Sequence, residues 1–300
     1  MTKTRPSRPR PKSFFKYMPV QTAKAVLKNQ SMRWSSPLLF NDPFDVPRQL
    51  TFGVTPERVS GELMKRVLKL IAHPPEDTSS LHKVLETVVK AVQMGFPEHL
   101  QAKLIAEFRE NFASAASTPA HLDGFREYWT DILPKLRILC VTESPSHVAM
   151  WHHYADKYTG VVLEFSPTGH ADSSFHHAAR VRYSKAEPAF YGAKGWAEFL
   201  TIKPEIAAKK LFNEAIFTKS QDWSYESEWR LFTFTNGVET KELFSDYEFF
   251  KTELTGIYLG PSLLDNERLE ILEMAGNYSE ARVAAVSIGM SREFIFTKCY

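Results

Sequence analysis

The spacing of apolar residues changes twice along the chain. Near the start, residues 14–17 (Phe-Phe-Lys-Tyr) and 31–35 (Ser-Met-Arg-Trp-Ser) are short, strand-like segments, and an amphipathic helix is expected over 21–27 between them. From about residue 56 to 135 the apolar residues instead recur every three or four positions. This period predicts helices at 57–72, 80–94, 98–114 and 122–133, with prolines at the breaks. We interpret 56–135 as a helical insertion or lid.

Strand patterns return after residue 136 and alternate irregularly with helical ones. Strands are expected at 137–142, 160–165, 179–183, 229–235, 255–259, 282–288 and 293–297, and helices at 147–156, 194–216 and 263–275. Because there is no regular βαβ repeat, the order predicts an α+β fold with a mixed, mostly antiparallel sheet. Residues 14–300 are expected to form a single α+β domain that contains the helical insertion.

The charge is unevenly distributed. The chain has 37 Lys and Arg against 35 Asp and Glu, a formal net charge of +2, and no acidic residue occurs among the first sixteen. Six of the positive charges lie in that short stretch, which leaves −4 for the remaining 284 residues. We predict that residues 1–13, rich in Pro and Arg, form a disordered tail, a solvated leader in preference to a nucleic-acid-binding arm.

Several functional classes are disfavoured by what the sequence lacks. It has no apolar run long enough to span a membrane and no secretory signal, so we expect a cytoplasmic protein without a membrane partner. Cys140 and Cys299 provide neither a disulfide framework nor metal-ligand spacing. Phosphate-binding glycine loops, a G-x-S-x-G elbow, H-E-x-x-H and C-x-x-C are also missing from the sequence. The sequence assigns no oligomeric state.

The first of three unusual segments is Asn41-Asp42-Pro43-Phe44-Asp45. Asn and Asp bond readily to their own backbone, and Pro43 fixes φ, so the segment predicts a defined turn. One interpretation is a structural loop in which Asp45 caps a helix. The other directs Asn41, Asp42 or Asp45 at a hydroxyl or amide of a ligand.

The second segment is Ser146–Asp156. At 100° per residue on a helix, one stripe contains His147, Met150, Trp151, Tyr154 and Tyr158. The stripe is either core packing or an aromatic platform on which Trp151 and Tyr154 stack a planar ligand. The adjacent pair at 152–153 diverges by about 100° on a helix, so no metal site is predicted.

The third segment is Lys219–Arg230. If 225–232 is extended, Glu226, Glu228 and Arg230 share one face, with the two carboxylates about 7 Å apart. They could hold substrate hydroxyls or supply an acid–base carboxylate. If the segment is helical, Glu226 and Arg230 form an ordinary i,i+4 ion pair. In both cases, loss of Arg230 is expected to destabilise the fold more than loss of a surface arginine.

Seven motifs in order resemble the bacterial domain-of-unknown-function family 2971. They are Lys16-Tyr17, Asn41–Asp45, Cys140-Val141-Thr142-Glu143, Met150–Tyr154, Gly160–Phe165, Trp223–Arg230 and Ile257–Pro261. The resemblance covers roughly residues 14 to 298 and implies no activity. A more distant similarity, at the level of the fold, is to ADP-ribosyltransferase-like proteins, in which a Glu-x-Glu pair comparable to Glu226 and Glu228 is catalytic. Those proteins open with His or Arg where this chain has Lys16.

Our leading functional hypothesis is a nucleotide- or NAD-handling transferase or glycohydrolase, of a defence type directed at phage or of a toxin type. Glu228 and Glu226 would be catalytic, and NAD is the candidate cofactor. The ligand-binding residues would be Lys16, Tyr17, Asn41, Asp42, Asp45, Trp151, Tyr154 and Arg230. One alternative is a non-enzymatic module that binds a small ligand or peptide. The other is a metal-dependent nuclease that uses Asp42, Asp45 and the glutamates, which the acidic body disfavours.

Overall fold

The computed structural model describes residues 9–50, 53–111, 118–167, 172–186, 188–235 and 242–299. Within these residues the chain divides into two compact units. Unit 1 comprises the described parts of Met1–Leu39, Leu136–Val181 and Asp222–Tyr300, and unit 2 those of Phe40–Lys135 and Arg182–Gln221. The 56–135 helices therefore share a unit with a second, later stretch of the chain.

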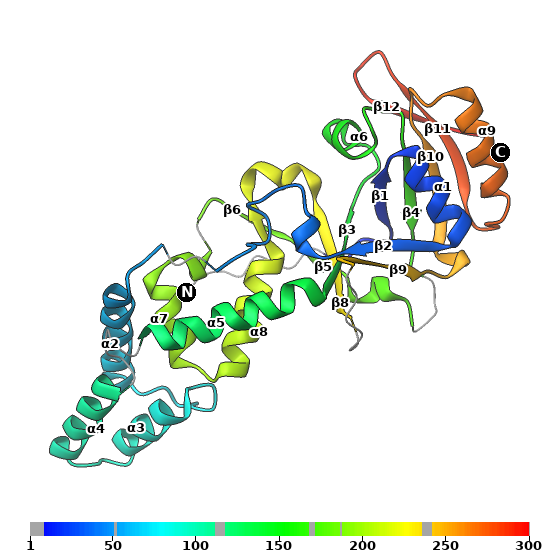
Figure 1. Cartoon of the computed structure of the whole chain (residues 1–300). Coiled ribbons are helices and arrows are strands. Elements are labelled where there is room, and N and C mark those ends of the chain that lie inside the picture. The colour runs from blue at the N-terminus through cyan, green and yellow to red at the C-terminus, as the bar shows by residue number, and fades with distance from the viewer. Residues whose placement is uncertain are drawn as a thin grey trace. The chain divides into compact units, whose positions relative to one another are not determined.

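Unit 1 is built on one large sheet (Figure 1). Its described strands are β1 (Phe14–Met18), β2 (Ser31–Ser35), β3 (Leu136–Thr142), β4 (Val161–Phe165), β5 (Ala179–Arg180), β8 (Glu228–Phe234), β9 (Phe244–Glu248), β10 (Leu254–Leu259), β11 (Arg282–Ile288) and β12 (Phe294–Lys298). They pair in the order β12-β11-β10-β4-β1-β3-β2-β9, while β8 pairs with both β3 and β5. Among these described pairings only β10–β11 is parallel.

The sheet forks at β3. Along one edge β3 pairs with β8 over its whole length, from Leu136 opposite Phe234 to Thr142 opposite Glu228. Along its other edge β3 pairs with two strands. Its last residue, Thr142, pairs with β1, and Ile138 pairs with β2. β1 and β2 therefore meet β3 at different points along its length.

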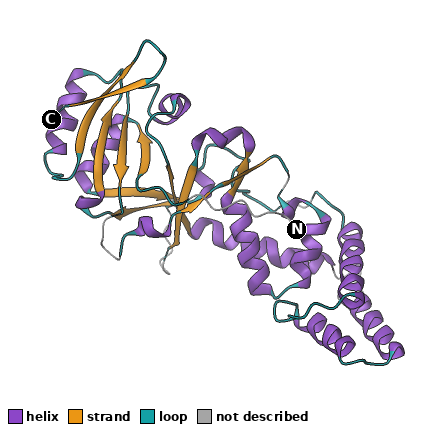
Figure 2. Cartoon of the chain, turned by 180° about the vertical axis from the view of Figure 1, so that it is seen from behind, coloured by secondary structure: helices purple, strands orange, loops and turns teal. Residues whose placement is uncertain are grey.

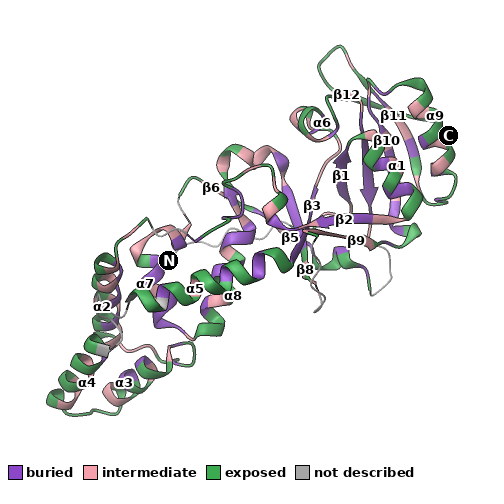
Figure 3. Cartoon of the chain, viewed as in Figure 1, coloured by how far each residue is buried: buried purple, intermediate pink, exposed green. Residues whose placement is uncertain are grey.

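Different helices cover the two faces of this sheet. Helices α1 (Val20–Asn29) and α9 (Asp265–Ala275) contribute to the larger apolar core, and α6 (Val148–Tyr154) packs in a second, smaller cluster (Figures 1 and 3). Apolar side chains alternate between the two clusters along β1, with Phe14 in the larger and Phe15 and Tyr17 in the smaller. The alternation brings the aromatic residues of α6 against β1.

Unit 2 is mostly helical (Figure 2). Its helices are α2 (Pro56–Ala72), α3 (Lys83–Gln93), α4 (Glu98–Asn111), α5 (Thr118–Ile132), α7 (Ala193–Thr201) and α8 (Pro204–Phe217), and its strands β6 (Arg182–Ser184) and β7 (Thr218–Ser220) pair in parallel. The apolar faces of these helices bury Leu63, Leu85 and Trp196, as their sequence period predicts. Thr55 caps α2 through its hydroxyl, and Pro56 follows at the first helical position.

The α+β fold and the mostly antiparallel sheet are confirmed. Three local predictions were wrong. The helix expected at 194–216 is two helices, α7 and α8, because Pro204 disfavours a helical conformation at Lys203. Of residues 225–232, considered as one extended segment, Tyr225 and Glu226 instead end a 3₁₀ helix over 221–226 and the strand begins at Glu228; β9 was not predicted.

Two predictions about organisation stay predictions. Residues 1–8 of the expected tail lie outside the described residues, and residues 9–13 contain no helix or strand. Arg10 donates from Nη2 to the carbonyl oxygen of Ala178 at 2.8 Å. A single domain over residues 14–300 likewise stays a prediction. Within the described residues, no helix combines the length and apolar character needed to cross a membrane.

Candidate functional site

The polar centre of unit 1 lies at the start of β8, where Glu228 and Arg230 alternate onto one side of the strand. Arg230 donates from Nε to Glu228 Oε1 at 2.7 Å and from Nη2 to Oε2 at 3.0 Å. Arg230 is 0% exposed and Glu228 is 4% exposed. The two residues form a buried, bidentate pair, with Thr142 and Cys140 opposite them on β3. The expected shared face is confirmed for this pair.

Glu226 reaches the same region by a different route. It ends the 3₁₀ helix Gln221–Glu226, and Ser227 follows with φ of 46°, in the left-handed region. Thr142 donates its hydroxyl to the Glu226 carbonyl oxygen at 2.5 Å, and Tyr154 donates its hydroxyl to Glu226 Oε1 at 2.6 Å. Glu226 therefore does not share the strand face with Glu228, and positive φ at a residue other than glycine is the kind of local strain that concentrates at functional sites.

Trp151 and Tyr154 have different environments, although both belong to α6. Trp151 is 0% exposed, donates from Nε1 to the carbonyl oxygen of Pro145 at 2.7 Å and packs edge-on against Tyr17. A fully buried ring has no face left for a ligand, so the expected stacking role of Trp151 is replaced by core packing. Tyr154 is partly exposed and directs its hydroxyl at Glu226.

Three aromatic rings that the site prediction omitted lie next to this centre. His147 and Tyr225 stack with their ring centroids 5.2 Å apart and an interplanar angle of 20°, and Trp223 lies 6.0 Å from Tyr225. All three residues are partly exposed. The His147 Nδ1 is buried and makes no hydrogen bond to any described residue. The helical spacing had placed His147 on the same stripe as Trp151 and Tyr154, although it was not chosen as a site residue.

Lys16 lies at the fork of the sheet. Its Nζ donates to the carbonyl oxygen of Cys140 at 2.8 Å, midway between the β3 residues that pair with β1 and β2. One of the three ammonium donors of Lys16 thus binds a β3 carbonyl oxygen that lies between the β1 and β2 pairings. Burial raises the pKa of the Cys140 thiol strongly. The nearby charge of Glu228 raises this pKa further, whereas the charges of Arg230 and Lys16 lower it.

Tyr17 connects β1 to the loop before α6. Its hydroxyl donates to the Ser144 carbonyl oxygen at 2.9 Å and accepts from the His147 amide at 3.4 Å. Burial raises the pKa of the Tyr17 hydroxyl, an effect that the His147 amide partly offsets. Tyr17 is 5% exposed, so it holds the His147 backbone in place and has little surface to offer a ligand.

The first unusual segment lies in unit 2. Asp42 Oδ1 accepts from the Phe44 amide at 2.9 Å, which confirms the defined turn. Asp45 caps no helix and instead pairs with Lys219 Nζ at 3.4 Å, with both side chains buried. Asn41 is exposed. An Asp45 carboxylate bound to an ammonium group gives no support to a metal-dependent nuclease, and no group of three potential metal ligands occurs among the described residues.

The second segment and residues 222–230 of the third, with Lys16 and Tyr17, thus belong to unit 1, while Asn41, Asp42 and Asp45 belong to unit 2 together with Lys219. Residues 150–231 match a family model. The family is DUF2971, described as a protein of unknown function. The expected resemblance is confirmed over this segment, which runs from α6 to β8 and includes Tyr154, Glu226, Glu228 and Arg230.

Two other comparisons were negative. No curated protein matches the chain, and no solved structure matches it. The similarity to ADP-ribosyltransferase-like proteins stays a prediction.

Proposed function

We propose that the chain is an enzyme that acts on a planar, nucleotide-type ligand at the Glu226 centre of unit 1. The observation that carries the proposal is the hydrogen bond between Tyr154 and Glu226, a buried carboxylate held at 2.6 Å beside the stacked rings of His147 and Tyr225. Residues 72 positions apart are needed to build this contact. Packing alone does not require a buried carboxylate there, because an apolar side chain would avoid its desolvation.

The two glutamates have different roles in this proposal. Both Glu228 oxygens accept from Arg230, which favours the charged form of the carboxylate and fixes its orientation. Glu228 then provides a fixed negative charge for an oxocarbenium-like centre, and the fully buried Arg230 positions it. Glu226, whose Oε1 accepts from the Tyr154 hydroxyl, is the acid–base group.

The ligand class follows from the rings and cations that are partly exposed. Tyr225 and Trp223 offer ring surface to a planar group, and the remaining ammonium donors of Lys16 suit a phosphate. These features support a nucleotide, and a carboxylate pair supports cleavage at a glycosidic carbon. NAD is therefore the first substrate to test, with transfer of ADP-ribose or glycohydrolysis as the reaction. A defence or toxin setting stays a prediction from the sequence.

The test is NAD consumption, and consumption of other nucleotides, by the full chain and by Glu226→Gln. We expect a loss of at least roughly a hundredfold in turnover, as is usual when an acid–base group is removed. Tyr154→Phe should lose less, because the carboxylate itself remains.

The matched control is Glu164→Gln. Glu164 is also buried and also accepts a tyrosine hydroxyl, from Tyr258 at 2.6 Å, but it lies on β4. Turnover should survive this change even if stability falls. A folded wild-type chain that consumes neither NAD nor other nucleotides, or turnover unaffected by Glu226→Gln, would refute the proposal. A ligand that binds and is recovered intact would favour the binding-module alternative.

A further inference from the structure

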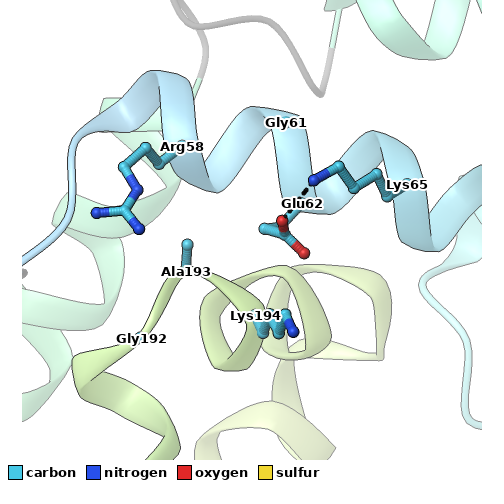
Figure 4. A pocket seen from close by; sticks show the side chains of 7 residues that line it. All are labelled: Arg58, Gly61, Glu62, Lys65, Gly192, Ala193 and Lys194. Carbon is cyan, nitrogen blue, oxygen red and sulfur yellow. Dashed lines mark hydrogen bonds and ion pairs between the residues drawn. The ribbon is translucent and has the colours of Figure 1, made fainter.

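A hollow in unit 2 lies between helices α2 and α7, separate from the residues of the proposed active site. Its volume is about 570 Å³, within the range of small-molecule sites. It is lined by Arg58, Gly61, Glu62, Lys65, Gly192, Ala193 and Lys194 (Figure 4). Helix α2 contributes the first four of these residues, and the start of α7 with the preceding glycine contributes the others.

The charge of this hollow is strongly unbalanced. Three cationic side chains surround one carboxylate, so the lining carries a net charge of +2. Lys65 Nζ pairs with Glu62 Oε1 at 2.8 Å. The pKa of Glu62 is lowered first by that hydrogen bond, and the charges of Lys194 and Arg58 add to the effect. These two further cations lie near the carboxylate without a hydrogen bond to it, and both are exposed.

The glycines of the lining are not required by the backbone. A Cβ on Gly61 would meet no atom within 4 Å, although glycine inside a helix is less favourable than alanine by about 1 kcal/mol. A Cβ on Gly192 would meet only the Ala189 carbonyl oxygen, at an ordinary 3.8 Å. Gly195, one turn into α7, is different, because a Cβ there would overlap Ala189. Neither close packing nor positive φ explains Gly61 and Gly192, and both line the hollow.

The start of α7 adds to the positive potential. Gly192 is the N-cap residue and provides no side-chain cap for the first amides of the helix. The first amides of a helix have no partner within it, and the helix dipole favours an anion at this end. Ala193 and Lys194, whose amides are among them, are residues of the lining.

We propose that this hollow is a binding site for a small sugar phosphate. Arg58 and Lys194 bind the phosphate with the first amides of α7, and Glu62 accepts a hydrogen bond from a sugar hydroxyl. A carboxylate beside an anion site suits a ligand that carries both a phosphate and a hydroxyl group. The same carboxylate disfavours inorganic phosphate alone. The site lies beyond the proposed function, since it uses none of the residues of the Glu226 centre.

Isothermal titration of the full chain with ribose 5-phosphate tests the proposal, and ribose serves as the ligand without phosphate. We expect ribose 5-phosphate to bind and ribose not to bind. Arg58→Ala and Lys194→Ala should each weaken binding roughly tenfold, the usual effect of losing a charge-assisted hydrogen bond. Lys209→Ala is the matched control, because Lys209 is an exposed lysine of α8 outside the hollow, and it should bind as the wild type does.

Gly61→Ala separates binding from folding. We expect it to raise the denaturation midpoint and to weaken binding, since its methyl group enters the hollow. Gly124→Ala is the control, because Gly124 lies in α5 with no atom within 4 Å of a Cβ and should raise the midpoint without affecting binding.

Three results would overturn the proposal: no binding of ribose 5-phosphate at millimolar concentration, unchanged binding in Arg58→Ala and Lys194→Ala, or equal binding of ribose. Glu226→Gln should bind ribose 5-phosphate normally. If this variant loses binding while Arg58→Ala keeps it, the ligand occupies unit 1 and the hollow is not its site. The active-site proposal is judged by turnover and can fail independently.

Discussion

The two units hold their polar residues in opposite ways. In unit 1, Glu228 and Arg230 are buried and bonded to each other, and Glu226 is buried against Tyr154. In the hollow of unit 2, Arg58 and Lys194 are exposed and only Lys65 pairs with the carboxylate. A buried charge depends on its partner, whereas an exposed charge is solvated by water. Chemistry and stability are therefore coupled in unit 1 and separable in the hollow.

This difference determines which substitutions are informative. Removing one member of a buried pair leaves an uncompensated charge, so a lost activity in unit 1 has to be separated from a lost fold. Substitutions in the hollow should report on binding alone. The following predictions test that contrast, from the largest expected effect on stability to the smallest.

Arg230→Ala should lower the free energy of unfolding by about 3–5 kcal/mol, because Glu228 would be left buried without its partner. Urea denaturation measures the change. Arg33→Ala is the control, since Arg33 makes a similar two-bond contact with Asp246 on the same sheet, with side chains 55% and 46% exposed. That change should cost about 1 kcal/mol or less. Equal losses in the two variants would contradict the contrast.

Asp45→Ala tests a pair in unit 2 that is buried like the Glu228–Arg230 pair of unit 1. Lys219 would lose its buried carboxylate, and we expect a loss of about 3 kcal/mol in the free energy of unfolding. Asp42→Ala removes only the hydrogen bond to the Phe44 amide, which contributes about 1 kcal/mol. If Asp45→Ala lowers the free energy of unfolding less than Asp42→Ala does, burial does not determine how much the Asp45–Lys219 pair contributes to stability.

Stability should fall in alkaline solution because of Tyr17. Its folded pKa is raised above the ordinary value of 10.0, so its contribution is complete below that pH and is lost as the pH rises beyond it. Urea denaturation at about pH 8 and about pH 11 should show a smaller decline in Tyr17→Phe than in the wild type. The Tyr258 and Tyr278 hydroxyls, whose pKa values are also raised, would account for the remaining decline. Identical declines in the two proteins would exclude a contribution from Tyr17.

The smallest effect is expected in the hollow. Glu62→Gln breaks an ion pair in which the Lys65 side chain is 75% exposed, and the denaturation midpoint should not change measurably. Lys194→Ala should behave in the same way. A clear destabilisation by either substitution would mean that the cations support packing of α2 on α7, and the contrast between the units would then fail.

The local pattern of apolar residues predicted most of the elements. The 3.6-residue period located α2, α3, α4 and α5, and alternation located β1, β2 and β8, because burial of one face imposes the period directly on the sequence. β9 was missed because its residues, Phe-Ser-Asp-Tyr-Glu, form a strand at the edge of the sheet with little burial. The break between α7 and α8 is signalled by Pro204, whose effect was underestimated.

The sequence alone also determined that Glu228 and Arg230 share a face, because strand alternation is a local rule. Only the tertiary structure decided which partners the other polar residues have. Trp151 is buried in the core, where a ligand platform was considered. Asp45 forms an ion pair with Lys219, and Glu226 accepts a hydrogen bond from Tyr154, 72 residues earlier in the chain. Those contacts depend on the fork at β3 and on the left-handed residue Ser227, neither of which leaves a periodic signal in the chain. Periodicity records which side of an element is buried, and the fold determines what lies against it.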